Sequence, residues 1–364
     1  MSPRLAVVHD YFTQIGGAER VVAHWVRDLE PVSVGAIAAA PDKELLELDY
    51  SSVRTTALNR LPLARRSPEY LLPVLPAMAR RIPVDADAEA VLVSTSGFAH
   101  LVRTRKPKIV YWHTPARWLY EEADYRLGLG RVGRAALTVL RPQLLSADRR
   151  SISPSDRHLC NSAVTQKRLA RAYGLEAHIV HPPVGLTSSP PVPPAADIPP
   201  GFFLSVGRPR GYKGADFVAR AAREAGVPLV QVGGQTAGSP LPGATVLENL
   251  TDGELAWLYR EALAVVSASR EDFGLTTVEG YQAGTPSVTV RSGGFLETCI
   301  EGVTGEFFAP GDVQELTGLL RRFDPARYPA DAVRAHGALF RPERHLTQVV
   351  QHVEDHVRAS GSGT

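Results

Sequence analysis

The sequence predicts an α/β fold with two domains, each built on a parallel sheet. Three observations lead to this class. The chain has 364 residues, which is the length of about two domains. Short apolar runs alternate along the chain with longer amphipathic stretches, as they do in parallel-sheet proteins. A proline-rich segment divides the chain near its middle. With 44% hydrophobic and 21% charged residues, the composition is that of a globular protein with a sizeable core.

The apolar runs and the amphipathic stretches locate the elements. The buried strands that the runs predict are residues 5–8, 91–94, 109–112, 202–206, 229–232 and 265–267. The helices that the amphipathic stretches predict are residues 18–29, 162–173, 215–224, 252–261 and 314–323. Thr251 and Glu254 have the spacing of a capping box, which supports a helix starting at residue 252. Apolar residues at helical spacing between 341 and 357 predict one more helix near the C-terminus.

The domain boundary is predicted from composition. Residues 186–200 contain six prolines in fifteen positions and no periodicity, which is typical of an extended linker. We therefore expect a first domain at 1–185, a linker at 186–200, a second domain at 201–340, and a helix with a flexible tail at 341–364. Each half opens with a strand followed by a helix. The expected architecture is two Rossmann-like domains that face each other across a cleft, with the last helix packing back on the first domain.

Charge is distributed unevenly between the halves. The whole chain has a formal net charge of +2, but residues 1–185 carry +7 and residues 186–364 carry −5. Within the first half, residues 51–82 (Ser51 to Ile82) contain six arginines and one acid, interleaved with apolar residues. Such a stretch suits an anionic membrane surface, although a solvated surface with a few buried leucines explains it as well.

The number of cysteines, the length of the apolar runs and the net charge argue against several classes of protein. Cys160 and Cys299 are the two cysteines of the chain, too few for a disulfide framework or a cysteine-based zinc site, and they fit a reducing cytoplasm. The first residues lack the apolar stretch of a secretion signal, and no run approaches the roughly 20 residues of a membrane-spanning helix. A net charge near zero argues against a nucleic-acid-binding surface. We expect a cytoplasmic protein, peripheral to a membrane at most.

Two glycine-rich turns predict an anion site. Gly16 and Gly17 directly precede the first helix, where paired glycines let backbone N–H groups approach a ligand. In the second half, residues 207–214 follow a strand and precede a helix, and Arg208 and Lys213 lie between the glycines. Two cations converging on a helix N-terminus are suited to a diphosphate, since arginine offers a fork of donors and lysine a mobile charge. A basic surface loop is the alternative interpretation.

Two glutamates on one short segment are the strongest indication of a ligand-binding site. Glu271 and Glu279 stand eight residues apart, with Gly274 between them and a helix expected to run from there to Gly284. A helix starting near Gly274 presents the free backbone N–H of Leu275, and carboxylates accept hydrogen bonds from the diols of a sugar or ribose. His113 follows an expected strand and is either a ligand contact or a hydrogen-bonded core residue.

The chain resembles, over nearly its whole length, the retaining glycosyltransferases of the GT-B fold, specifically glycosyltransferase family 4. The N-terminal Gly-Gly-Ala-Glu-Arg turn, His113-Thr-Pro, the 207–214 loop and the Glu-x7-Glu string carry this resemblance. The N-terminal portion, with His9-Asp and His113-Thr-Pro-Ala-Arg-Trp, looks most like bacterial enzymes that transfer mannose from GDP-mannose in surface-polysaccharide assembly. Asp272 departs from the pattern, because a small residue often stands at that position.

The resemblance implies roles for individual residues. Arg208 and Lys213 would neutralise the donor diphosphate, Glu271 would bind sugar hydroxyls, and His113 would reach the donor sugar. The residues that would line the rest of the donor site are Gly16, Gly17, Phe273, Gly274, Leu275, Glu279, Asn249 and Leu250. The base pocket is expected around residues 247–250 and Arg208.

The resemblance also implies the reaction. A hexose, mannose from GDP-mannose, would pass to a lipid-linked, glycan or small-molecule acceptor with retained stereochemistry, by front-face attack in which the leaving phosphate takes the acceptor proton. No cofactor or metal is expected, because the chain lacks a suitably placed Asp-x-Asp. Three alternatives stay open: a UDP-sugar-dependent transferase of the same fold, a nucleotide-sugar epimerase, and a non-catalytic nucleotide-sugar-binding partner of an assembly complex.

Overall fold

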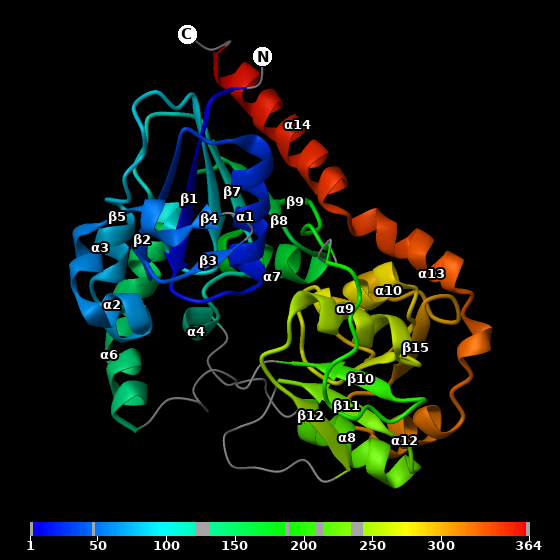
Figure 1. Ribbon diagram of the computed structural model, residues 1–364. Helices are drawn as coiled ribbons and strands as arrows, with labels where there is room; N and C mark the ends of the chain where they lie inside the picture. The colour runs from blue at the N-terminus through cyan, green and yellow to red at the C-terminus, as the bar shows by residue number, and fades with distance from the viewer. Residues whose placement is uncertain are drawn as a thin grey trace. The chain divides into compact units, whose positions relative to one another are not determined.

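The computed structural model describes residues 3–45, 48–120, 131–185, 189–207, 214–233 and 243–361 (Figure 1). The chain forms two compact units. The first comprises Met1–Pro183 together with His345–Thr364, and the second comprises Val184–Arg344. The first unit is therefore made from two separate stretches of the chain.

The sheet of the first unit is doubly wound. Within the described residues its strands are parallel and lie in the order β5-β2-β1-β6-β7-β8-β9. Their bounds are β1 Leu5–Phe12, β2 Ser33–Ala39, β5 Arg54–Thr55, β6 Ala90–Thr95, β7 Lys108–Trp112, β8 Arg157–Cys160 and β9 His178–Ile179. A short antiparallel pair, β3 (Glu44–Leu45) and β4 (Leu48–Asp49), lies apart from this sheet. The chain winds one way from β1 and the other way from β6, so the direction reverses between these two strands.

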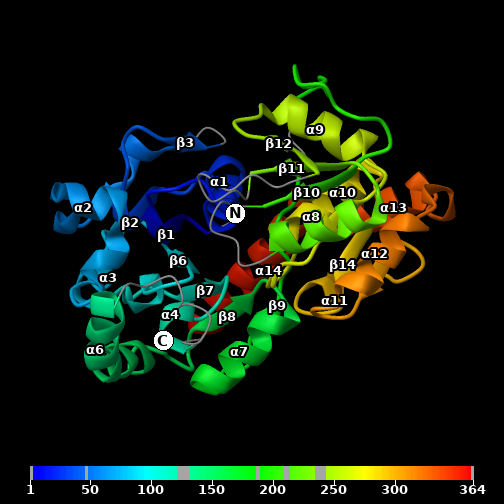
Figure 2. The same cartoon turned by 90° about the horizontal axis from the view of Figure 1, so that it is seen from below.

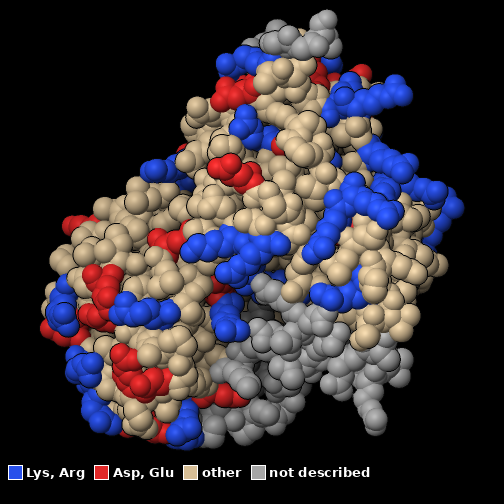
Figure 3. Space-filling view, turned by 180° about the vertical axis from the view of Figure 1, so that it is seen from behind, with Lys and Arg blue, Asp and Glu red and all other residues tan. Residues whose placement is uncertain are grey.

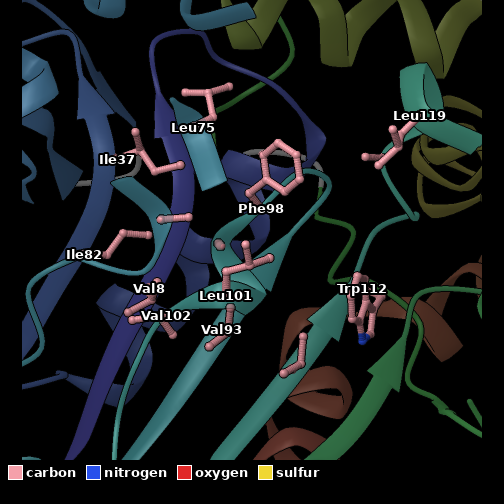
Figure 4. Close-up of a cluster of buried hydrophobic side chains, with 14 of the residues drawn as sticks. Val8, Ile37, Leu75, Ile82, Val93, Phe98, Leu101, Val102, Trp112 and Leu119 are labelled. Atoms are coloured by element: carbon pink, nitrogen blue, oxygen red, sulfur yellow. The ribbon is translucent and has the colours of Figure 1, made fainter. Parts of the chain in front are cut away.

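Helices cover both faces of this sheet. Their bounds are α1 Gly17–Leu29, α2 Pro62–Arg66, α3 Leu75–Ala79, α4 Arg117–Tyr120, α6 Arg131–Arg149, α7 Ala163–Tyr173 and α14 Pro342–Gly361. Alternate residues of the buried strands face opposite sides of the sheet. Val8 and Val93 contribute to the core under α2, α3, α4, α6 and α7. Figure 4 shows these two valines among the side chains of that core. Val7 and Leu92 contribute to the core under α1 and α14.

The last helix packs on the first unit, as the sequence predicts. Val349 and Val353 of α14 are buried in the same core as Trp25 of α1, and Figure 1 shows the two helices on the same side of the sheet. Two hydrogen bonds fix the start of α14. The Trp25 indole Nε1 donates to Nε2 of His345 at 2.8 Å, and Nδ1 of His345 donates to the His181 carbonyl at 2.7 Å.

The second unit repeats the doubly wound arrangement. Within the described residues its parallel strands lie in the order β12-β11-β10-β13-β14-β15. Their bounds are β10 Phe203–Val206, β11 Leu229–Val232, β12 Ala244–Leu247, β13 Val265–Ser267, β14 Ser287–Val290 and β15 Gly305–Phe308. The helices are α8 Gly214–Ala225, α9 Asp252–Glu261, α10 Leu275–Ala283, α11 Phe295–Thr298, α12 Val313–Arg321 and α13 Ala330–Gly337. Helices α8 and α12 cover one face, and α9 and α10 the other (Figures 1 and 2).

The predicted elements agree with the structure within one or two residues, except the last helix and the first strand. Helix α14 continues to Gly361, four residues past the predicted apolar pattern and into the expected flexible tail, and Arg358 pairs there with Glu354 one turn earlier. Strand β1 continues to Phe12, four residues beyond the predicted end, because His9 and Asp10 are buried polar residues that the apolar run does not include. The capping box of α9 is confirmed: the Thr251 hydroxyl accepts from the Glu254 N–H, and the Glu254 carboxylate accepts from the Thr251 N–H.

Candidate functional site

The candidate site of the second unit lies where its sheet changes winding direction. Strands β10 and β13 are neighbours, yet the chain leaves β10 toward β11 and leaves β13 toward β14. In open α/β sheets, ligands bind outside the carboxyl ends of the strands at such a switch point. Gly207 follows β10 and Ala268 follows β13, so the two motifs predicted from the sequence flank the same point.

The loop after β13 carries Glu271 to the start of α10. Gly274 is the N-cap of that helix, with φ +89°, a left-handed conformation that favours glycine. A Cβ at Gly274 would lie 2.6 Å from the Phe295 ring. Leu275 is the first helical residue, so its backbone N–H is among the donors left unpaired at a helix start. The Glu271 carboxylate is exposed beside this helix end and accepts a hydrogen bond from the Ser269 hydroxyl at 3.1 Å.

A pair of glycines supports this loop and was not identified from the sequence. Gly293 and Gly294 follow β14, and Gly294 donates its backbone N–H to the Glu271 carbonyl at 2.9 Å. A Cβ at Gly294 would lie 2.3 Å from Cα of Phe273, and one at Gly293 would lie 2.4 Å from the Glu271 oxygen. The contact therefore requires glycine. Two adjacent glycines after a buried strand, Arg291-Ser-Gly-Gly294, were the available signal.

Glu279 lies four residues beyond the first residue of α10. Its half-buried carboxylate accepts a hydrogen bond from the hydroxyl of Tyr259, on α9, at 2.5 Å. A carboxylate can accept several hydrogen bonds, so a group at this position suits a ligand diol. Tyr259 was not singled out in the sequence, where it has only the spacing of a buried residue of α9.

Two further predicted regions lie along the same edge of the sheet. Asn249 and Leu250 connect β12 to α9, and Asn249 has φ +55°, a conformation that asparagine tolerates better than most residues. Gly233, after β11, has φ +62° and approaches the Gly207 carbonyl so closely that a Cβ would lie 2.5 Å from it.

The predicted cations Arg208 and Lys213 lie outside the described residues. Gly214, the first residue of α8, packs against the loop after β13, with its Cβ position 3.3 Å from the Ser269 nitrogen.

The first unit presents a second set of predicted residues at its own switch point. Gly16 is the N-cap of α1 in an extended conformation, and Gly17 is the first helical residue, as predicted. Glu19, in the first turn of α1, is buried and has its carboxylate 4.0 Å from Nε2 of His9. The carboxyl ends of β1 and β6 lie next to each other here.

His113 follows β7 directly and is part of a chain of polar side chains. Its Nε2 lies 2.8 Å from the Ser94 hydroxyl, which lies 3.0 Å from Nδ1 of His9. The His113 carbonyl accepts hydrogen bonds from Asn161 and Thr165, both at 3.0 Å. Burial lowers the pKa of the half-buried His113 to about 3, and the neighbouring histidines act in the same direction. The imidazole is therefore neutral at physiological pH.

Asp10 holds the loop that follows Ser94. Its buried carboxylate accepts hydrogen bonds from four consecutive backbone N–H groups at 2.6–2.9 Å, those of residues 96–99. A carboxylate enclosed by amide donors is a strong anchor, because each bond is charge-assisted. Asp10 was not predicted to have this role, although the sequence places an acid two residues after the first apolar run.

Other features of the described residues bear on the chemistry. Within them, no three His, Cys, Asp or Glu side chains are placed to hold a metal ion together. Cys160 and Cys299 are buried, and neither is in a disulfide within this part of the chain. No helix in the described ranges is long and apolar enough to cross a bilayer.

A comparison with protein families finds a match within the second unit. Residues 194–323 match the family described as Glycosyl transferases group 1. The D-inositol 3-phosphate glycosyltransferase 2 of Catenulispora acidiphila is 30% identical over 255 residues, which are 58% of this chain and 60% of that protein. The glycogen synthase of Mycobacterium tuberculosis is 45% identical over 74 residues, 20% of this chain and 18% of that protein. The chain thus spans less than two thirds of the length of these relatives.

Comparison with solved structures identifies the fold. The crystal structure of Anabaena Alr3699/HepE in complex with UDP and glucose covers 97% of this chain and all of that one, with a TM-score of 0.66 and 18% identity. The sucrose-phosphate synthase of Thermosynechococcus elongatus covers 99% of this chain and 98% of that one, with a TM-score of 0.64 and 16% identity. The fold is GT-B: two Rossmann-like α/β domains and a C-terminal helix on the first, as the sequence predicts.

Proposed function

We propose that this GT-B protein, whose second unit carries a group 1 glycosyl transferase domain, moves a hexose from a nucleotide sugar to an acceptor with retention of configuration. The start of α10 carries the proposal. There a left-handed glycine, the N-terminal N–H groups of a helix and an exposed carboxylate lie together at the switch point of a parallel sheet. The N–H groups suit the phosphates of a donor and the carboxylate suits the hydroxyls of its sugar.

Each residue then has a part in the transfer. As the bond from sugar to phosphate breaks, the nucleoside diphosphate gains negative charge, which helix N-terminal amides at Gly274 and Leu275 stabilise. Arg208 and Lys213 would add positive charge to that diphosphate. Glu271 orients the sugar by its hydroxyls, and Glu279 holds the ribose. In front-face attack the leaving phosphate oxygen takes the acceptor proton, so neither acid is required as a base.

The donor is proposed from two sources. The N-terminal motifs favour GDP-mannose, and this is the donor we propose. The second candidate is a UDP-sugar, which the solved Anabaena protein favours because that protein binds UDP and UDP-glucose. The acceptor is proposed to be a lipid-linked sugar, a glycan or a small polyol such as an inositol phosphate, the last because several relatives are named for it.

Donor binding and turnover test the proposal. We expect GDP-mannose or a UDP-sugar to raise the melting temperature of the protein, because a ligand that binds only the native state stabilises it. With an acceptor present, the protein should release nucleoside diphosphate, and it should do so in the presence of EDTA. Glu271→Gln should lower kcat/KM about tenfold to a hundredfold, since it removes a charge-assisted hydrogen bond. Glu261→Gln, an exposed acid at the end of α9, is the matched control.

The alternatives give different results in the same experiment. An epimerase would convert the nucleotide sugar into an isomer without acceptor, which chromatography of the products detects. A non-catalytic partner would bind the donor in calorimetry and release no diphosphate with any acceptor. Full activity of Glu271→Gln together with Glu279→Gln would contradict the site assignment.

We also propose that residues 51–82 attach the first unit to an anionic membrane. Within the described residues, Arg54 pairs with Asp85 at 2.6 Å, and Arg80 donates to the Ala147 carbonyl. Among the other residues of the stretch, exposed cations and exposed apolar side chains alternate: Arg60, Leu61, Leu63, Arg66, Val74 and Arg81. Figure 3 shows Lys and Arg side chains gathered over part of the first unit, with few acids among them.

Vesicle sedimentation tests the attachment. The double variant Arg60→Ala/Arg66→Ala should bind vesicles containing phosphatidylglycerol about thirtyfold less well, because each arginine near the surface contributes roughly 1 kcal/mol. Arg54→Ala, which removes an arginine already paired with an acid, is the control. Equal binding of both variants, or binding that is unaffected by salt, would contradict the proposal.

A further inference from the structure

The polar chain of His9, Ser94 and His113 joins three neighbouring strands. His9 on β1 and Ser94 on β6 are partners in the parallel register, and His113 follows β7, with its backbone N–H donating to the Thr95 carbonyl at 2.9 Å. Ser94 is fully buried, and His9 is 2% exposed. The register of the sheet therefore brings the three side chains together without any contribution from a flexible loop.

The direction of the hydrogen bonds in this chain follows from the acceptor at one end. Nδ1 of His9 lies 3.0 Å from the Ser94 hydroxyl oxygen and 3.3 Å from the Ser94 carbonyl oxygen. A carbonyl oxygen only accepts, so Nδ1 of His9 carries a proton. The Ser94 oxygen then accepts from His9, and its own hydroxyl proton is donated to Nε2 of His113, 2.8 Å away.

Glu19 does not change this direction. Its carboxylate lies 4.0 Å from Nε2 of His9, on the other side of that ring from Ser94. At 4.0 Å this carboxylate is beyond hydrogen-bond distance of Nε2, so the contacts of Nδ1 decide the direction. The hydrogen bonds between His9, Ser94 and His113 would have the opposite direction only if His9 carried its single proton on Nε2. That tautomer would place the Nδ1 lone pair of His9 against the Ser94 carbonyl oxygen.

We propose that His9 and Ser94 are positioning residues that hold His113 as the neutral tautomer with its proton on Nδ1, so that His113 offers a hydrogen-bond donor to a ligand oxygen. Within the described part of the chain, Nδ1 of His113 has no hydrogen-bond partner, and Nε2 is occupied by Ser94. His113 then keeps no free lone pair and does not act as a general base. This role rests on the proposed function only for the identity of the oxygen, which would belong to a substrate of the sugar transfer.

Further hydrogen bonds hold the backbone near Ser94 and at His113. The carboxylate of Asp10 fixes the backbone directly after Ser94, through residues 96–99. Asn161 and Thr165 donate to the His113 carbonyl. The tautomer is thus set by groups that are themselves held in place, which is the condition for a fixed proton position on a histidine ligand.

Nitrogen NMR of the full chain labelled with ¹⁵N-histidine tests the tautomer directly. The two signals of His113 are assigned by their loss in His113→Asn. At pH 7 and without ligand, we expect Nδ1 to have the shift of a protonated ring nitrogen and Nε2 that of an unprotonated one. The reverse assignment, or averaged shifts from a mixture of tautomers, would overturn the proposal.

Variants test the role of the serine. Ser94→Ala should convert the His113 signals to a tautomer mixture and lower kcat/KM for sugar transfer about tenfold to a hundredfold, the range seen when a hydrogen-bond partner of a metal-bound histidine is removed. Thr95→Val, which removes a hydroxyl one residue along the strand, should leave the tautomer unchanged. A pure Nδ1–H tautomer in Ser94→Ala would refute the role of Ser94. If the wild type transfers no sugar, the proposed function fails, whereas the NMR result still decides this proposal.

Discussion

The attachment of α14 to the first unit is predicted to weaken in acid because of His345. Burial lowers the pKa of His345 from 6.5 to about 4, although its hydrogen bond to the His181 carbonyl acts in the opposite direction. Nε2 of His345 accepts the indole N–H of Trp25, so a proton at Nε2 would place two N–H groups against each other. Between pH 6.5 and 4 the unfolded chain therefore binds a proton that the native chain does not. The contribution of His345 to the free energy of unfolding is therefore largest above about pH 6.5, and it is lost as the pH is lowered toward 4.

The magnitude follows from the two pKa values. A difference of 2.5 between them corresponds to about 3 kcal/mol in total, and about 2 kcal/mol of this is lost between pH 7 and pH 5. His345→Gln should remove this loss, because an amide can still accept from Trp25 and donate to His181 without titrating. We therefore expect the stability of the variant to depend less steeply on pH than that of the wild type by about that amount.

Urea unfolding followed by tryptophan fluorescence measures the effect. In a Trp257→Phe background the signal comes from the first unit, which avoids treating two units as one transition. His336→Gln, in the second unit, is the matched control and should keep the wild-type slope. Equal loss of stability in the wild type and in His345→Gln between pH 7 and pH 5 would refute the reasoning.

Three further substitutions test other features. Gly294→Ala places a Cβ 2.3 Å from Cα of Phe273, so it should cost about 1–3 kcal/mol by overpacking and abolish donor-induced thermal shifts; retained donor binding would contradict the supporting role of this glycine. Asp10→Asn turns an acceptor for four N–H groups partly into a donor and should destabilise the first unit by about 2–3 kcal/mol in urea, whereas an unchanged midpoint would contradict its role as an anchor. Tyr259→Phe removes one hydrogen bond that orients the Glu279 carboxylate and should raise KM for the donor several-fold with little change in the melting temperature of the free protein; an unchanged KM would argue against Glu279 as a donor contact.

The α/β class and most elements were predictable because their signals are local. The apolar runs at residues 229–232 and 265–267 coincide with β11 and β13, and the capping box at Thr251 fixes the start of α9. The helical start at Leu275 followed from Gly274 alone. Periodicity and capping are properties of neighbouring residues, so one sequence is enough to detect them.

The supporting residues of both sites were not predictable because their roles depend on contacts between distant segments. Ser94 acquires its role only when β6 lies between β1 and β7, and Asp10 only when the loop at 96–99 folds over it. Gly294 is required because the loop after β14 touches the loop after β13. Such relations are set by strand order and register, which a periodic pattern does not encode.

The first unit is built from two stretches of the chain that are far apart in sequence, and this affects its synthesis on the ribosome. Its main stretch ends at Pro183, but two of its core residues, Val349 and Val353, are translated about 160 residues later, after the whole second unit. At about 5–20 residues per second, the apolar face around Trp25 waits on the order of ten to thirty seconds for its covering helix. The nascent first unit therefore exposes that face to chaperones, and to other nascent chains, while the second unit is being synthesised.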